Sequence, residues 1–208
     1  MYSNKRKQIL EKYINNPDKV FVAPNTLDIS SLSNHHNQLK EIGVDEIKKQ
    51  LKWDSEFNLI YVGRLIKSKD VDYLIDVIKQ IPESIDVSLH IIGDGPEMNS
   101  LKLKSENYSR VIFHGEILDM ESIGKMLFAS DMMLIPGYVG LAVVHAFAYG
   151  CPVITTKTDL KHGPFHSPEF EYIIEGKNGF ILKGEIHEYT KKLLEIIKEK
   201  ESLKQISL

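Results

Sequence analysis

Apolar and polar positions alternate along the chain in a way that predicts strands and helices in turn. From residue 57 onward, short apolar runs suited to buried strands are followed by glycine or proline and then by segments of helical periodicity. The predicted strands are 57–62, 87–92, 111–114, 131–135, 152–156 and 180–182, and the predicted helices are 71–81, 97–105, 120–129, 141–149 and 186–206. This repetition is typical of right-handed crossovers on a parallel sheet. We therefore predict an α/β fold: a Rossmann-like, three-layer parallel sheet flanked by helices.

The segment before residue 57 follows no such alternation. Residues 4–14 and 40–51 have the apolar spacing of short helices. Residues 20–23 form an apolar run that predicts a short strand, and the polar run 30–38 predicts a loop. The one soft boundary along the chain is therefore expected near 30–40, between a leading segment and the α/β body.

Composition fits a single folded domain, or a small two-lobed one. The chain has 208 residues, of which 42% are hydrophobic and 26% charged, so it can bury a core and is not disordered. A net charge of −3 argues against nucleic acid as the main partner. One cysteine, Cys151, excludes a disulfide framework and a cysteine zinc site, and it fits a reducing compartment. The sequence shows neither an apolar run of about 18 residues nor a signal-peptide core, so we expect a cytoplasmic protein.

The turns after the predicted strands hold the candidate chemistry, because ligands of open α/β sheets bind beyond the carboxyl ends of the strands. In the turn 63–70, Gly63 permits a sharp change of direction, and Arg64 and Lys69 then supply two cations. A guanidinium fork and an ammonium group suit a diphosphate, although the stretch also fits an ordinary solvated basic loop. The chain lacks Gly-x-Gly-x-x-Gly, which disfavours a nicotinamide-dependent oxidoreductase, and the turn is not a Walker A motif.

The later turns carry further candidates. The turn 93–97 is expected to end a strand and begin a helix, and the turn 113–117 is either an ordinary strand exit or a backbone edge facing a ring-shaped group. In 136–141, two glycines precede an apolar helix whose free backbone N–H groups suit an anion. His145 in that helix is either a satisfied core residue or, if it faces the cleft, a hydrogen-bond donor to a hydroxyl or phosphate.

The segment 161–172 contains histidines and acids. His162 and His166 are four residues apart, but Gly163-Pro164 and Pro168 exclude a regular helix there, so we expect no metal site. Glu169 and Glu171 are acids near the expected cleft or members of a solvated loop.

Six motifs in order resemble one family. They are PNTLD at 24–28, YVGRLIKSKDVDYLI at 61–75, IIGDGPE at 91–97, FHG at 113–115, GLAVVHAFAYGCPVIT at 140–155 and EYIIEGKNG at 171–179. In this order they resemble the carboxyl-terminal half of retaining glycosyltransferases of family four, over roughly residues 18–183. These enzymes have the GT-B fold, which is two Rossmann-like domains with the active site between them.

The resemblance implies that this half binds a nucleotide-sugar donor, UDP- or GDP-linked, without a metal or other cofactor. Arg64 and Lys69 would hold the diphosphate and meet the charge that develops on it as it departs. The backbone at Glu116 and Ile117 would meet the nucleobase, and amides of the 139–141 loop would meet phosphate and sugar. The expected site comprises Gly63, Arg64, Lys69, Glu116, Ile117, Gly137, Tyr138, Val139, Gly140, Leu141, His145 and Glu171.

Two departures from the family's pattern matter. The family has two glutamates separated by seven residues, and here Gly137 and His145 stand at those positions. His145 could still hydrogen-bond the ribose, while Glu169, Glu171 or His166 could meet the sugar hydroxyls.

The family's amino-terminal, acceptor-binding domain has no counterpart in the sequence. We therefore expect residues 1–17 to be a linker helix remnant of that domain and 18–208 to be the donor-binding domain.

The function implied is hexose transfer to a growing bacterial surface glycan, such as lipopolysaccharide or capsule. The glycan or lipid-linked acceptor would be held by the missing domain, with the enzyme in the cytoplasm or at the cytoplasmic face of the membrane. The missing glutamates leave an alternative from another class, a non-catalytic Rossmann-like binding or assembly module that pairs with another chain.

Overall fold

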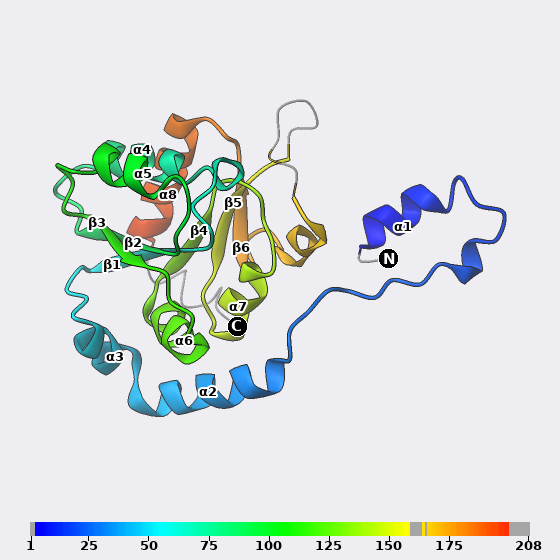
Figure 1. Ribbon diagram of the computed structural model, residues 1–208, viewed down its shortest axis with the longest axis horizontal. Coiled ribbons are helices and arrows are strands. Elements are labelled where there is room, and N and C mark those ends of the chain that lie inside the picture. The colour runs from blue at the N-terminus through cyan, green and yellow to red at the C-terminus, as the bar shows by residue number, and fades with distance from the viewer. Residues whose placement is uncertain (1–2, 159–163, 165, 200–208) are drawn as a thin grey trace.

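A six-stranded parallel sheet forms the centre of the molecule (Figure 1). The computed structural model describes residues 3–158, 164 and 166–199. The strands are β1 (Phe57–Val62), β2 (Val87–Ile92), β3 (Val111–Gly115), β4 (Met132–Ile135), β5 (Val153–Thr156) and β6 (Gly179–Leu182). Their order across the sheet is β3-β2-β1-β4-β5-β6, with every neighbouring pair parallel. The predicted Rossmann-like sheet is confirmed.

Helices cover both faces of this sheet, so the predicted three layers are confirmed. The helices are α1 (Asn4–Leu10), α2 (Ile29–Ile42), α3 (Val44–Leu51), α4 (Val71–Gln80), α5 (Met98–Lys104), α6 (Met120–Ala129), α7 (Ala142–Ala148) and α8 (Ile186–Lys198). Short 3-10 turns are η1 (Pro17–Lys19), η2 (Lys67–Lys69) and η3 (Pro168–Tyr172). Helices α4, α5 and α8 pack on one face, and α2, α3, α6 and α7 on the other. Along β1, Leu59 and Tyr61 point to the first core and Ile60 to the second, as strand geometry requires.

The order of the strands places two turns side by side. Strand β1 pairs with β2 on one side and with β4 on the other, and its crossovers run in opposite directions from that point. A crevice forms at such a reversal, outside the carboxyl ends of the strands. The turns after β1 and β4 therefore become neighbours, although more than 60 residues separate them in sequence.

The region before β1 differs from the sequence-based prediction. Residues 20–23 form no strand, and the stretch 30–38 is helical within α2 rather than a loop. Asp28 caps α2, since its side chain accepts from the Ser30 N–H at 3.0 Å. Packing supplies what intrinsic helix propensity lacks, because Leu32 and Leu39 are buried against α6 and α7.

The other helices agree with the predictions except at their ends. The predicted helix 40–51 is divided at Gly43, whose φ of 90° no regular helix accommodates. Helix α1 ends at Leu10, four residues before the predicted end. Helix α8 ends at Lys198, and residues 200–208 lie outside the described part of the chain.

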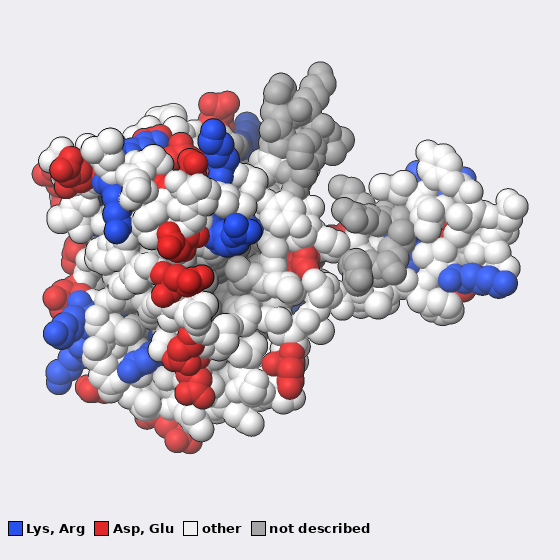
Figure 2. Space-filling view, in the orientation of Figure 1, with Lys and Arg blue, Asp and Glu red and all other residues white. Residues whose placement is uncertain are grey.

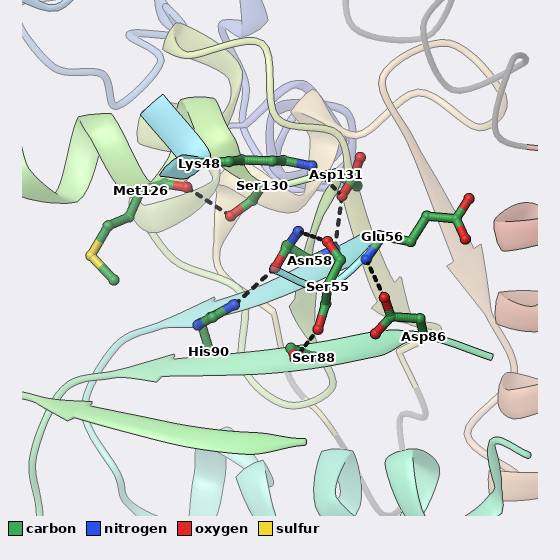
Figure 3. Close-up of polar contacts among 10 residues, drawn as sticks. All are labelled: Lys48, Ser55, Glu56, Asn58, Asp86, Ser88, His90, Met126, Ser130 and Asp131. Carbon is green, nitrogen blue, oxygen red and sulfur yellow. Dashed lines mark hydrogen bonds and ion pairs between the residues drawn. The ribbon is translucent and has the colours of Figure 1, made fainter. Parts of the chain in front are cut away.

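Buried polar side chains near the start of β1 are hydrogen-bonded to one another (Figure 3). Asp131 accepts from the Asn58 N–H at 2.7 Å and from Lys48 Nζ at 3.1 Å. Asn58 Oδ1 lies 3.1 Å from Nε2 of His90, whose ring stacks on Trp53 with centroids 3.7 Å apart. These contacts satisfy groups that would otherwise be buried without partners, so the cluster joins α3 to the sheet rather than presenting free ligating groups.

Candidate functional site

The turns after β1 and β4 pack directly against each other. The Tyr138 N–H donates to the Ser68 carbonyl at 2.9 Å. At Gly137, a Cβ atom would lie 2.5 Å from Ser68 O and 2.5 Å from the Lys69 carbonyl carbon. Only glycine permits so close a backbone approach. The predicted site residues of the two turns are therefore brought together.

Lys69 is held between the two turns. Its Nζ donates to the Tyr138 carbonyl at 2.7 Å and lies 4.8 Å from the centroid of the Tyr138 ring. Burial lowers the pKa of Lys69, because the charged form loses hydration there. A partly desolvated cation with a fixed position is well suited to meet an anion.

Arg64 lies in the same turn and is exposed. Its backbone is fixed, since the Tyr61 hydroxyl donates to the Arg64 carbonyl at 3.0 Å. Its guanidinium donates to no atom of the residues that the structure describes. In this turn Lys69 is thus anchored, whereas the Arg64 side chain is exposed and is not hydrogen-bonded within the described residues.

The turn 93–97 supports the first turn, as the sequence predicts for a strand stop. A Cβ atom at Gly93 would lie 1.9 Å from Gly63 O, and one at Gly95 would lie 2.4 Å from Leu65 O. The Leu65 N–H donates to Asp94 O at 2.9 Å. The two glycines therefore allow the backbone of the turn 93–97 to pack directly against the backbone of the turn 63–70.

Three amides in the loop after β4 were expected to be free. The Val139 N–H is not, because it donates to His166 Nδ1 at 3.2 Å. The N–H groups of Gly140 and Leu141 donate to no described atom, and Leu141 is the residue that precedes α7. The structure thus leaves two of the three amides for a ligand.

Acids and bases are mixed on the surface around these turns. Figure 2 shows lysine, arginine, aspartate and glutamate interspersed over the face in view, with no broad area of a single sign. The positive charge of the candidate site is therefore local and comes from the turn 63–70, not from a broad basic surface.

The comparisons with known proteins agree with this fold. The sequence model of the family described as "Glycosyl transferases group 1" matches residues 43–207. The chain belongs to this family. An uncharacterised glycosyltransferase of Methanocaldococcus jannaschii is 26% identical over 206 residues, which is 95% of this chain and 48% of that protein. The chain therefore spans about half the length of this relative.

Two solved structures show the same fold. Anabaena HepE in complex with UDP superposes with a TM-score of 0.72 at 21% identity, over 99% of this chain and 55% of the other. WaaG, a glycosyltransferase involved in lipopolysaccharide biosynthesis, superposes with a TM-score of 0.75 at 18% identity, over 100% of this chain and 55% of the other. The group 1 chain is thus one Rossmann-like half of a GT-B fold.

The acids that the sequence offers for sugar hydroxyls are engaged elsewhere in this group 1 chain. Glu169 is 3% exposed, accepts from Asn25 Nδ2 at 2.6 Å with one carboxylate oxygen and accepts from the Ser167 hydroxyl with the other. Glu171 accepts from the Ser3 hydroxyl at 2.5 Å. Both nitrogens of His166 are also used, one by Val139 and one by the Thr156 carbonyl at 2.8 Å. None of the three is positioned as a free sugar ligand.

His145 keeps an unused group. Its Nδ1 is buried and has no hydrogen-bond partner among the described residues, and burial lowers the pKa of the ring. It lies in α7, in the helix that follows the free amides of Gly140 and Leu141. A neutral imidazole with a spare nitrogen can donate to or accept from a hydroxyl.

The exit of β3 turns sharply at Gly115, whose φ is 74°. Its carbonyl accepts from the Gly93 N–H at 2.8 Å, which fixes the exit against the turn after β2. Beyond it Glu116 is exposed, and Ile117 packs on the core beside α6 and α7. The exit of β3 is therefore fixed at Gly115, at the edge of the sheet and two strands from β1, whose following turn carries Arg64.

Candidate metal ligands do not gather in the part of the chain that the structure describes. His162 lies outside the described residues. None of the described helices is long and apolar enough to cross a membrane.

Sequence reasoning missed the contacts that hold the loop after β4. Asn25 of the PNTLD motif binds Glu169, and its carbonyl accepts from the Tyr172 hydroxyl at 2.6 Å. These partners are more than 140 residues apart. Asn25 lies within one of the six motifs, but the sequence indicated neither a role for it nor its partner.

Proposed function

We propose that this chain is the nucleotide-sugar donor-binding domain of a retaining glycosyltransferase that takes a UDP- or GDP-linked hexose. The observation that carries the proposal is the closure of the turn 63–70 on the loop 136–141. It fixes the Lys69 ammonium beside Tyr138, next to two free amides. The UDP bound to Anabaena HepE supports the choice of donor.

Arg64 and Lys69 bind the diphosphate in this proposal. When the sugar leaves, negative charge builds up on the diphosphate oxygens. Cations and amides that are already in position stabilise that charge without reorganising, and the effect is larger where water is excluded. The partial burial of Lys69 favours this, because a bound diphosphate compensates the ammonium group for the hydration that burial has removed.

The rest of the donor is assigned to the neighbouring turns. The backbone at Glu116 and Ile117 meets the nucleobase, the Gly140 and Leu141 amides meet phosphate and sugar, and His145 Nδ1 meets a ribose hydroxyl. The assignment of His145 rests on its unpartnered nitrogen. No metal or further cofactor takes part in the proposal.

The acceptor belongs to a second domain. We assign it to a growing bacterial glycan, free or lipid-linked, such as lipopolysaccharide or capsule, with transfer at the cytoplasmic face of the membrane. The match to WaaG, which is involved in lipopolysaccharide biosynthesis, supports this assignment. Residues 1–17 would then belong with the acceptor-binding domain, and 18–208 form the donor-binding domain.

Calorimetry with UDP and GDP in metal-free buffer tests donor binding. We expect one nucleoside diphosphate to bind and the double variant Arg64→Ala/Lys69→Ala to bind about tenfold weaker or worse, since two charge-assisted contacts are lost. Lys67→Ala is the matched control, because it removes an exposed cation of the same turn. If neither nucleotide binds at millimolar concentration, or if the control loses as much as the double variant, the proposal fails.

A second candidate is a non-catalytic module that assembles with another chain. It is favoured by the leading arm, residues 3–28, most of which extends away from the body (Figure 1). On the arm, Tyr13 is 81% exposed and Ile9 is 52% exposed. Apolar groups in such positions are typical of an interface. Turnover of a nucleotide sugar by this chain together with an acceptor-binding domain would exclude the purely structural role. If the chain does assemble with another chain through the arm, the double variant Ile9→Ser/Tyr13→Ser should weaken that association.

A further inference from the structure

His166 lies between the loop after β4 and the end of β5. Its Nδ1 receives the Val139 N–H at 3.2 Å, and its Nε2 lies 2.8 Å from the Thr156 carbonyl oxygen. A carbonyl oxygen only accepts, so Nε2 must carry the hydrogen. Nδ1 must then hold the lone pair that accepts from Val139. One neutral tautomer satisfies both contacts.

Neighbouring residues hold the ring and the loop in this arrangement. Phe170 stacks on His166 with ring centroids 4.4 Å apart and planes 8° apart. The Ser167 N–H donates to the Val139 carbonyl at 3.2 Å, and the Ser167 hydroxyl oxygen lies 2.7 Å from the same carbonyl, its single hydrogen being shared between this carbonyl and the Glu169 carboxylate. Both polar backbone atoms of Val139 are therefore bound by two consecutive residues.

Val139 in turn constrains the two residues after it. The Val139 side chain is fully buried, at 0% exposure, so this residue cannot turn without disrupting the core. Gly140 and Leu141 come next, and their N–H groups are the two left without an acceptor among the described residues. The direction of these two amides thus depends on how the Val139 peptide is held.

We propose that neutral His166 is a positioning residue that, together with Ser167, aims the Gly140 and Leu141 amides at the donor diphosphate. This inference rests on the proposed donor binding. His166 acts through Val139 and does not touch the nucleotide, because both of its nitrogens are already used.

Protonation of His166 would end this role. A proton on Nδ1 would face the Val139 N–H, and two donors cannot bond to each other. Burial lowers the pKa of His166, and Lys69 lowers it further, while the bond to Thr156 opposes both. The neutral form therefore persists at neutral pH and is lost only in acid. Among the described residues, the titratable groups on the segments next to His166 are Lys69, Tyr138, Lys157, Glu169, Glu171 and Tyr172.

The test compares two substitutions over a range of pH. Glutamine has an oxygen that accepts and an amide that donates, and it does not titrate. Phenylalanine keeps the ring that stacks on Phe170 but has neither polar group. His187→Gln is the matched control, because His187 is exposed on α8. UDP affinity is measured by calorimetry from about pH 7.5 to about pH 5, which spans the ordinary titration of histidine.

We expect His166→Phe to bind UDP about threefold to tenfold weaker at neutral pH, the effect of one lost hydrogen bond. His166→Gln should bind nearly as wild type there and should lose less affinity than wild type in acid. His187→Gln should follow wild type at every pH. The titration of UDP itself affects all four proteins equally, so the differences between them report on His166.

The inference is overturned if His166→Phe binds as wild type, or if wild type and His166→Gln lose affinity in parallel as the pH falls. If His166→Phe does not fold, the second comparison decides. The Val139 amide resonance gives a measurement that needs no nucleotide. It should move with pH in wild type and stay constant in His166→Gln. If that shift occurs but UDP does not bind, the proposed function fails while the contact stands.

Discussion

Gly137 is the residue at which the structure makes its sharpest prediction. A Cβ atom there would lie 2.5 Å from Ser68 O, 2.5 Å from the Lys69 carbonyl carbon and 2.7 Å from Lys69 O. All three are backbone atoms, so no side chain can swing aside to relieve the overlap. Gly137→Ala must therefore separate the two turns.

The cost follows from overpacking. Forcing one methyl group into a packed region costs about 1–3 kcal/mol. For a chain of this size that corresponds to a melting temperature lower by about 2–12 °C. Separation of the turns would also break the contact between Lys69 Nζ and the Tyr138 carbonyl. UDP affinity should therefore fall as well, by about threefold to tenfold for the loss of one anchored cation.

Gly140→Ala provides the comparison within the same loop. A Cβ atom at Gly140 would lie 3.6 Å from Tyr138 Cε1 and 3.9 Å from Lys69 Nζ, which is ordinary contact. Both variants are measured by chemical denaturation and by UDP calorimetry. We expect Gly137→Ala to be clearly less stable than Gly140→Ala. Equal stability of the two, with wild-type UDP binding by Gly137→Ala, would refute the close packing of the turns.

Three further predictions concern stability. Asp70 has a φ of 54°, so Asp70→Gly should raise the free energy of unfolding by about 1 kcal/mol. Burial and Asp72 raise the pKa of Asp70 to about 6, so its ionised form is disfavoured in the folded state. The stability gained by Asp70→Gly, measured by urea denaturation, should therefore shrink as the pH falls from 7 towards 4. Burial, together with His114 and Lys48, lowers the pKa of His90 to about 3, so the folded state holds the ring neutral. The free energy of unfolding should therefore fall as the pH drops from about 6.5 towards 3. In His90→Phe this dependence on pH should be smaller, and an unchanged dependence would contradict the assignment. The Tyr189 hydroxyl is buried without a partner among the described residues. Tyr189→Phe should therefore leave the stability unchanged or raise it by up to about 1 kcal/mol in thermal melts. A loss of stability of more than about 1 kcal/mol would reveal a missed hydrogen bond.

The sheet could be predicted from the sequence because its strands are buried on both faces. Val87–Ile92 is buried at every position, and its four apolar residues with Gly93 directly after them mark it as a buried strand in the sequence. The sequence did not predict the order of the strands or the meeting of the turns after β1 and β4, because the general rule for open α/β sheets places a ligand only at the carboxyl ends of the strands.

Helix α2 could not be predicted in the same way. Its residues 30–38 are polar and weak helix formers, and its stability comes from partners distant in sequence. His35 Nδ1 lies 2.9 Å from the Tyr149 hydroxyl, and the His36 ring packs at the edge of Phe128. Such contacts leave no local signal, because they depend on where α6 and α7 lie.

The sequence identified the candidate cations of the site but not the geometry around them. Arg64 and Lys69 are visible in the sequence because they follow a strand and a glycine. Whether an amide is free depends on its neighbours in space, which is why Val139 was expected to be available and is bound to His166. The same holds for Glu169, which is an acid near the cleft in sequence and a buried partner of Asn25 in the structure.

The missing glutamate at position 137 and the buried lysine are two aspects of one arrangement. Backbone atoms of Ser68 and Lys69 occupy the space that a side chain at 137 would need, and that same contact brings Lys69 Nζ onto the Tyr138 carbonyl. Burial lowers the pKa of Lys69, and none of the acids in the described part of the chain forms an ion pair with it, so the ammonium group would be stabilised by an incoming anion. In the proposed function, the absence of a glutamate at position 137 is therefore accompanied by a greater stabilisation of Lys69 by the bound diphosphate.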